Sequence, residues 1–151
     1  RQPRLLQWRV ELQAMLTSSG QAANFMALFN ICECGDHIVA SSSIYGGTFN
    51  LISVTMAKMG ITATFVSPDA TEEELNAAFK PNTKVMFGET IANPALTVLD
   101  IELFAKVAHE HGVPLVVDNT FPTPVTAAPS NGVLTLLLTP PPNTWTDMAQ
   151  H

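Results

Sequence analysis

Charged side chains are scarce in this 151-residue chain, and basic ones are the scarcest. Only 13% of the residues are charged, and 7 Lys and Arg stand against 13 Asp and Glu, which gives a formal net charge of -6. Binding to nucleic acid depends on clustered basic side chains that neutralise phosphates, so this balance argues against a nucleic-acid partner.

Long apolar runs are also missing, although 46% of the residues are hydrophobic. No stretch approaches the roughly 20 apolar residues that a membrane-spanning helix needs. Trp8, Arg9 and Glu11 occupy the region where a secretory signal would have its apolar run. The sequence therefore predicts a cytoplasmic protein without a membrane partner.

Cysteine is nearly absent as well. The two cysteines, Cys32 and Cys34, are separated by one residue, a spacing that disfavours a disulfide between them. A metal site would need further ligands at suitable spacing, and His37 alone does not supply them. We expect reduced thiols, as in cytoplasmic proteins, and no metal site.

What the chain does contain is a regular alternation of helical and extended patterns. A capping box, Thr71 followed by Glu74, marks one helix start, Asp100 caps another, and Gly60 ends a third helix. Strands separated by helices indicate βαβ units around a mostly parallel sheet. The sequence thus predicts an α/β fold, with helices over residues 21–31, 49–59, 72–79 and 101–111 and strands over residues 37–41, 61–66, 84–88 and 113–117.

The two ends do not share this pattern. Residues 1–13 show no helix cap and no clean periodicity, and residues 126–151 combine a leucine-rich run with three consecutive prolines, Pro140 to Pro142. Consecutive prolines are incompatible with the interior of a helix or sheet. We expect an α/β domain over residues 14–125, with atypical ends over 1–13 and 126–151. One interpretation of the second end is a Pro-rich linker or partner-binding tail.

Candidate binding residues stand at element boundaries. Ser19, Gly20 and Gln21 begin a predicted helix, where free N–H groups and the helix dipole favour an anion such as phosphate. Tyr45 follows a strand, at the end where α/β proteins bind ligands, and its ring could stack on a flat cofactor. Structural explanations stay open for both, namely an ordinary helix cap and a tyrosine packing on its own domain.

Asp118 and Asn93 follow two other predicted strands. An ionised carboxylate at Asp118 could pair with a protonated ring nitrogen and make that ring an electron sink, although a turn-capping role is also open. Asn93 could donate a hydrogen bond to a ring substituent, because its strand ends at the same edge of the sheet.

The order of these motifs is more specific than any one of them. Ser18-Ser-Gly-Gln-Ala-Ala23, Ile44-Tyr-Gly-Gly-Thr48, Gly88-Glu-Thr-Ile-Ala-Asn-Pro-Ala95 and Val117-Asp-Asn-Thr-Phe-Pro-Thr-Pro124 together resemble the Cys/Met-metabolism family of pyridoxal-phosphate enzymes. The residues of these motifs are most similar to those in the O-acetylhomoserine sulfhydrylase branch of the family. The resemblance runs from about residue 14 to residue 125.

This resemblance implies a fold, a cofactor and a site. The fold would be part of the large, cofactor-binding domain of a fold-type I, aspartate aminotransferase-like enzyme, and the cofactor would be pyridoxal 5'-phosphate. Family members hold the phosphate with the segment matching Ser19, Gly20 and Gln21, stack the ring on the residue matching Tyr45, and pair the ring nitrogen with the residue matching Asp118. Asn93 matches the residue near the ring hydroxyl, and Thr120 lies in the same shell.

The resemblance also implies an activity, an amino-acid substrate and a homo-oligomeric parent. The reaction would make homocysteine or methionine from O-acetylhomoserine and sulfide or a thiol. The family's Schiff-base lysine follows the Val-Asp-Asn-Thr segment, whereas this chain has no lysine after Phe121. We therefore expect a fragment without a catalytic residue of its own. A cystathionine γ-synthase or γ-lyase fragment and a non-enzymatic α/β binding module with a Pro-rich tail are the alternatives.

A shifted reading frame would explain the missing lysine. A family-like continuation His-Ser-Thr-Thr-Lys-Tyr-Met, written in one plausible codon choice and read one base later, becomes Thr-Pro-Pro-Pro-Asn-Thr-Trp. That is the sequence of residues 139–145. We expect the DNA near codon 125 to restore a Ser-x-Thr-Lys run after a single-base shift.

Overall fold

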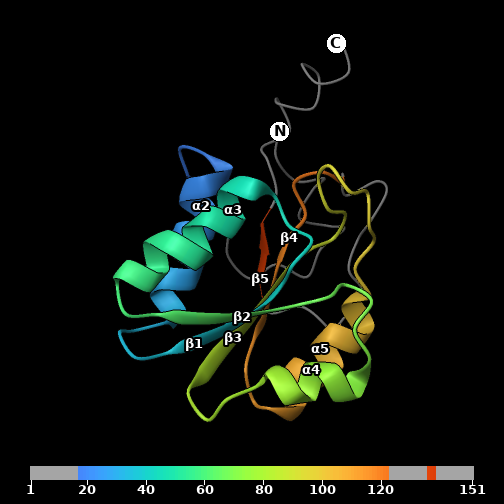
Figure 1. The fold of residues 1–151 in the computed structure, drawn as a ribbon. Coiled ribbons are helices and arrows are strands. Elements are labelled where there is room, and N and C mark those ends of the chain that lie inside the picture. The colour runs from blue at the N-terminus through green and yellow to red at the C-terminus, as the bar shows by residue number, and fades with distance from the viewer. Residues whose placement is uncertain (1–16, 123–135, 139–151) are drawn as a thin grey trace, which may run out of the picture.

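Parallel strands form the centre of the molecule, and helices cover both faces of the sheet (Figure 1). The computed structural model describes residues 17–122 and 136–138. The strands are β1 (His37–Ser41), β2 (Thr62–Val66), β3 (Thr83–Glu89), β4 (Leu115–Asp118) and β5 (Leu136–Leu138). Their order in the sheet is β2-β1-β3-β4-β5, and each neighbouring pair is parallel.

Two hydrophobic cores lie on opposite faces of this sheet. On one face α4 (Glu72–Ala78) and α5 (Ile101–Glu110) cover Val39, Met86 and Val117. On the other face α2 (Gly20–Ile31), α3 (Gly46–Asn50) and the π-helix η1 (Leu51–Met56) cover alternate positions such as Ile38 and Phe87. Successive side chains of a strand point to opposite faces, so the consecutive apolar residues at 38–40 in β1, 85–87 in β3 and 115–117 in β4 are what a sheet covered on both sides requires.

The predicted α/β class with a mostly parallel sheet is confirmed, and the element boundaries differ in detail. The helix predicted over residues 49–59 begins earlier, at Gly46, and its second half is the π-helix η1. The strand predicted over 84–88 extends to Glu89. Strand β5 was not predicted and lies within the end assigned to residues 126–151, while residues 1–13 and the rest of that end lie outside the described residues.

The strand order places a crevice between β1 and β3. From β1 the chain passes through α3 and η1 to β2 on one side, and then through α4 to β3 on the other side of β1. Loops that leave β1 and β3 at their carboxyl ends therefore diverge toward opposite faces. In open α/β sheets, ligands bind at such a topological switch point.

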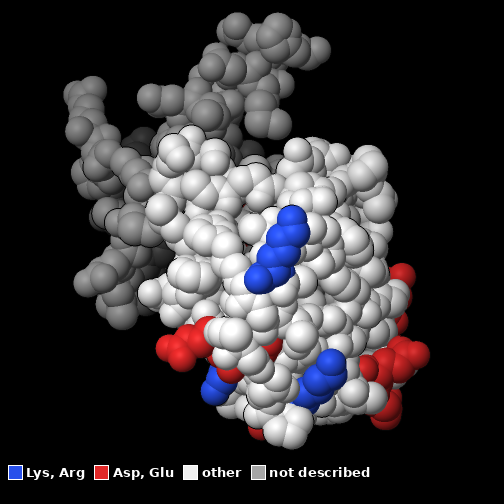
Figure 2. Space-filling view, turned by 60° about the vertical axis from the view of Figure 1, so that its left-hand side comes forward, with Lys and Arg blue, Asp and Glu red and all other residues white. Residues whose placement is uncertain are grey.

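The surface formed by α2, α3 and η1 carries few charges. Figure 2, which brings this side forward, shows a largely uncharged face with a basic side chain near its middle and the other charged side chains along its lower and right-hand edges. Helix α2 contains no charged residue, and Met26, Phe29, Phe49 and Val54 are exposed on these helices. In the part of the chain that the structure describes, no helix is long and apolar enough to span a membrane.

Candidate functional site

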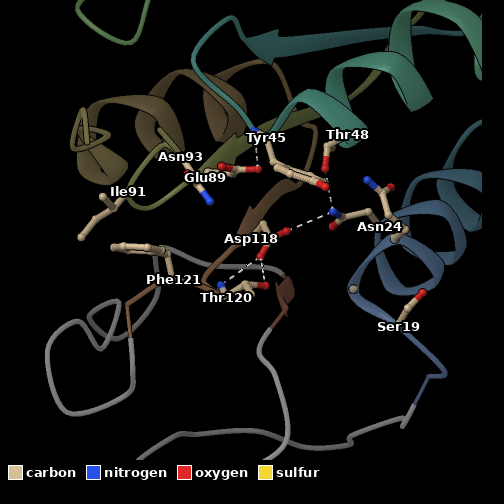
Figure 3. Close-up of a pocket in the computed structure, with 12 residues that line it drawn as sticks. Ser19, Asn24, Tyr45, Thr48, Glu89, Ile91, Asn93, Asp118, Thr120 and Phe121 are labelled. Atoms are coloured by element: carbon tan, nitrogen blue, oxygen red, sulfur yellow. Dashed lines mark hydrogen bonds between the residues drawn. The ribbon is translucent and has the colours of Figure 1, made fainter. Parts of the chain in front are cut away.

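A cavity of about 350 Å³ lies at the carboxyl ends of β1, β3 and β4, against the N-terminus of α2. In Figure 3 the Tyr45 ring lies on one side of this cavity and Asp118 on the opposite side. The cavity thus occupies the switch point between β1 and β3. Its lining comes from four separate segments of the chain: Ser19, Gly20, Gln21, Asn24, Tyr45, Thr48, Glu89, Ile91, Asn93, Asp118, Thr120 and Phe121.

The N-terminus of α2 offers hydrogen-bond donors to this cavity. Ser19 is the N-cap, and its side chain accepts the N–H of Ala22 at 3.1 Å. The N–H groups of Gly20 and Gln21 have no acceptor within the helix, because they precede its first i→i−4 hydrogen bond. A Cβ built on Gly20 would meet no atom within 4 Å, so the space beside this backbone is open. An anion can approach the helix end closely there.

Tyr45 is held beside Gly47 at the start of α3. A Cβ built on Gly47 would lie 2.5 Å from the Tyr45 ring and 2.3 Å from Gln21 Nε2. Both side chains therefore use the space that a side chain at residue 47 would fill. Tyr45 is about half exposed, at 51%, which leaves part of its surface open to a ligand.

Asp118 is buried at the end of β4 and fixed by three donors. Its Oδ2 accepts a hydrogen bond from Asn24 Nδ2 at 3.0 Å, and its Oδ1 accepts the N–H of Thr120 at 2.9 Å and the Thr120 hydroxyl. A carboxylate has about four acceptor positions, so the described residues leave one of them open. Asn24 Nδ2 also donates to Thr48 Oγ1 at 3.1 Å, while Asn24 Oδ1 is buried without a hydrogen-bond partner among the described residues.

Glu89 is a second buried carboxyl group in the cavity wall, only 7% exposed. It is the last residue of β3 and is paired in register with Asp118 of β4. Glu89 Oε1 accepts the backbone N–H of Tyr45 at 2.8 Å. Burial raises the pKa of Glu89 to about 7; the N–H of Tyr45 lowers it, the charge of Asp118 raises it, and the N–H of Asn93 lowers it.

All seven residues that the sequence suggested for cofactor binding line this one cavity. The sequence interpretation missed the other five lining residues, which are Asn24, Thr48, Glu89, Ile91 and Phe121. Some of them carried a signal: Asn24 lies one helical turn after Gly20, and Phe121 follows Thr120 directly. Glu89 stood within the quoted motif but received no role.

The remaining sequence predictions concern the cysteines and His37. Cys32 is buried, Cys34 is exposed, and neither forms a disulfide. His37 is buried at the start of β1. Its Nδ1 forms a hydrogen bond with Thr83 Oγ1 at 2.8 Å, and its Nε2 forms one with Thr64 Oγ1 at 2.9 Å. Within residues 17–122 and 136–138, no group of three potential metal-ligating side chains is placed to hold a metal ion.

Taken together, the lining suits a flat, anionic ligand with a polar ring. The helix end can take an anionic group, Tyr45 can stack on a ring, and Asp118 can accept a hydrogen bond from the ring edge. Phe121 and Ile91 add an apolar side (Figure 3).

Comparison with known sequences places the chain in a defined group. Residues 6–132 match the family model described as Cys/Met metabolism PLP-dependent enzyme. The chain is 47% identical over 118 residues to O-acetyl-L-homoserine sulfhydrylase of Corynebacterium glutamicum, a match that covers 78% of this chain and 27% of the relative. It is 50% identical over 108 residues to homocysteine synthase of Schizosaccharomyces pombe, covering 72% of this chain and 25% of the relative. The chain thus spans about a quarter of the length of these relatives.

Solved structures show the same architecture. A Campylobacter jejuni structure described as an O-acetylhomoserine (thiol)-lyase, with N'-pyridoxyl-lysine-5'-monophosphate, matches with a TM-score of 0.77 and 35% identity over 81% of this chain and 30% of that chain. The O-acetylhomoserine sulfhydrylase of Wolinella succinogenes matches with a TM-score of 0.75 and 35% identity, covering 81% of this chain and 34% of that chain.

Proposed function

Because the chain belongs to the Cys/Met-metabolism family of PLP-dependent enzymes, we propose that its cavity binds pyridoxal 5'-phosphate. The observation that supports this most is the convergence of Tyr45, Asp118 and the N-terminus of α2 on one cavity. The chain would be part of the cofactor-binding domain of a cytoplasmic, homo-oligomeric enzyme.

The lining residues fit the parts of this cofactor. The phosphate would bind at Ser19, Gly20 and Gln21, where the helix end is open. Tyr45 would stack on the ring, and the acceptor position of Asp118 that the described residues leave open would take the ring N–H. This assignment leaves Asn93 for the ring hydroxyl.

Two further polar residues would support these contacts. Thr120 would act through Asp118, because its N–H and hydroxyl both donate to Asp118 Oδ1. Asn24 would keep the other oxygen of Asp118 in place, because its Nδ2 donates to Asp118 Oδ2.

The full-length protein would make homocysteine or methionine from O-acetyl-L-homoserine and sulfide or a thiol, as the names of its relatives suggest. Bound pyridoxal phosphate supplies an electron sink next to the α-carbon of an amino-acid substrate. In this chain Asp118 would hold the proton of the ring nitrogen, Tyr45 would orient the ring, and the helix end would anchor the phosphate. Acetate would leave the γ-carbon of the substrate, and the sulfur nucleophile would take its place.

We further propose that this chain alone does not complete that reaction. No lysine is among the residues lining the cavity, and the sequence has none after Phe121. Borohydride treatment with pyridoxal phosphate should therefore fix no adduct at a cavity residue. A frame shift would account for the missing lysine, and the DNA near codon 125 tests that explanation.

Titration of the chain with pyridoxal phosphate, followed by absorbance, tests the binding proposal. Asp118→Asn keeps the size of the side chain and removes its charge, so affinity should fall about tenfold or more, as expected for a charge-assisted hydrogen bond. Asp100→Asn is the matched control. Asp100 caps α5 by accepting the N–H of Leu103 at 3.0 Å, and Asn caps helices equally well. Absence of binding by the parent, or equal affinities of the parent and Asp118→Asn, would contradict the proposal.

A further inference from the structure

Glu89 has no role in the ligand contacts described above, yet it is one of two acidic residues that line the cavity. A buried carboxyl group costs stability unless its surroundings compensate. Its burial raises the pKa of Glu89 to about 7, so the compensation is incomplete. Carboxyl groups whose pKa values are raised by burial are concentrated at functional sites.

Glu89 forms a hydrogen bond with the loop that contains Tyr45. Glu89 lies at the end of β3, and Tyr45 lies after the neighbouring strand β1, on the other side of the switch point. Glu89 Oε1 accepts the Tyr45 N–H at 2.8 Å (Figure 3). Tyr45 is the N-cap residue of α3 and makes no side-chain cap hydrogen bond. The hydrogen bond to Glu89 thus fixes the backbone of a residue whose ring is half exposed.

We propose that Glu89 is a positioning residue, which holds the backbone of Tyr45 so that the tyrosine ring stays at the cavity wall. The proposal rests on the proposed function, in which Tyr45 stacks on the cofactor. The essential property of Glu89 is an acceptor oxygen at this place. A neutral side chain of the same length that keeps an acceptor should therefore replace it.

The single tyrosine of the chain allows a direct measurement. Since Tyr45 is the only tyrosine, selective labelling with ¹⁵N-tyrosine gives one amide signal, which reports the hydrogen bond without any ligand. Glu89→Gln keeps an acceptor, and Glu89→Leu keeps a similar size without one. Glu74→Leu is the matched control, because Glu74 Oε2 accepts the N–H of Thr71 at 2.8 Å in the capping box of α4, away from the cavity.

In Glu89→Leu, the Tyr45 amide should exchange with solvent about tenfold faster than in the parent, as the loss of one hydrogen bond predicts. In Glu89→Gln and Glu74→Leu, exchange should stay within about twofold of the parent. Parent-like exchange in Glu89→Leu would overturn the proposal. Rapid exchange in Glu89→Gln would also overturn it, and this result can be obtained even if Glu89→Leu does not fold.

Titration of the same variants with pyridoxal phosphate connects the position of Tyr45 to binding. Glu89→Leu should bind about tenfold more weakly, and Glu89→Gln and Glu74→Leu should bind like the parent. If the parent does not bind pyridoxal phosphate but the Tyr45 amide responds as described, the proposed function fails and the positioning role stands. If the parent binds and Glu89→Leu binds equally well, the positioning role fails and the proposed function stands.

Discussion

Gly47 has no side chain, and two cavity residues use the space that one would fill. In Gly47→Ala, the new Cβ would lie 2.3 Å from Gln21 Nε2 and 2.5 Å from the Tyr45 ring, so both side chains must shift. Leaving a preferred rotamer costs about 0.5–1.5 kcal/mol, and affinity for pyridoxal phosphate should fall up to about tenfold. Equilibrium titration measures this change.

Gly46→Ala is the control for that substitution, because a Cβ at Gly46 meets no atom within 4 Å. Both substitutions introduce the same methyl group into α3, so a general effect on helix stability would appear in both. Equal affinities of the two variants would show that the space beside Gly47 does not control the position of Tyr45 and Gln21.

The buried carboxyl of Glu89 should make folding stability depend on pH. Burial raises the pKa of Glu89 from its ordinary value of 4.5 to about 7 in the folded state, so the folded protein binds more protons than the unfolded one between these values. Stability therefore falls as pH rises through this window, by up to roughly 3 kcal/mol. Urea denaturation at pH 5 and pH 8 measures the difference.

Substitution isolates the contribution of Glu89 to this dependence. Glu89→Gln has no proton to lose, so its free energy of unfolding should fall less than that of the parent between pH 5 and pH 8. The exposed Glu33 provides the comparison, and Glu33→Gln should keep the parent's dependence. A parent-like slope in Glu89→Gln would mean that other groups cause the pH dependence.

At the scale of elements, His37 links three neighbouring strands. Its ring pairs with Thr83 in β3 and Thr64 in β2 while His37 itself begins β1. Burial, with a smaller effect of Lys80, lowers the pKa of His37, so the unfolded state binds its proton more readily. The contribution of the neutral His37 ring to the free energy of unfolding is therefore complete above the ordinary pKa of His37. It is lost as pH falls below that pKa, because the unfolded state takes up the proton first.

His37→Leu should remove both ring hydrogen bonds and lower the free energy of unfolding by about 1–3 kcal/mol at pH 7.5. The loss should be smaller at pH 5, where the parent itself is weakened. His109→Leu, at an exposed position of α5, is the control and should leave stability nearly unchanged. Urea denaturation at both pH values checks the prediction, and a loss of equal size at both would contradict the titration of His37.

The sequence predicted the helices and strands well where local signals are strong. It predicted them less well where tertiary contacts determine whether an element forms. The capping box of Thr71 and Glu74 and the cap of Asp100 place the starts of α4 and α5 correctly. The start of α3 at Gly46 and the π-helix after it were missed, because glycines at a helix start lower the local helix signal. The three-residue strand β5 depends on pairing with β4, which no local pattern reveals.

The convergence of the seven candidate residues on one cavity was predictable from their places in the elements. Ser19, Tyr45 and Asp118 each follow or begin an element, and the carboxyl ends of parallel strands meet at one edge. Glu89 was missed because its importance depends on burial and on a hydrogen bond to a residue 44 positions away. Contacts across the sheet carry no periodic signal in the sequence.

For the whole molecule, the sparsely charged surface of α2, α3 and η1 predicts self-association. A helix without charged residues is typical of a buried element, yet Met26 and Phe29 of α2 are exposed. We expect the chain to associate in solution and the double variant Met26→Gln, Phe29→Gln to shift toward monomer. Analytical ultracentrifugation over a range of concentrations measures the shift.

The control for this prediction alters two other exposed apolar residues, Leu96 and Val98, which lie in the loop after β3. The double variant Leu96→Gln, Val98→Gln should associate like the parent. A monomeric parent, or an equal loss of association in both double variants, would show that the surface of α2 does not mediate contact between copies.

The walls of the cavity come from four segments that are distant in the chain and meet only once β1, β3 and β4 have paired. A ligand of this cavity therefore has nothing to bind in an unfolded molecule, and mass action stabilises the folded one as ligand concentration rises. The number of ligand molecules bound per chain at saturation then counts the correctly folded fraction of a preparation, a quantity that total protein concentration does not reveal.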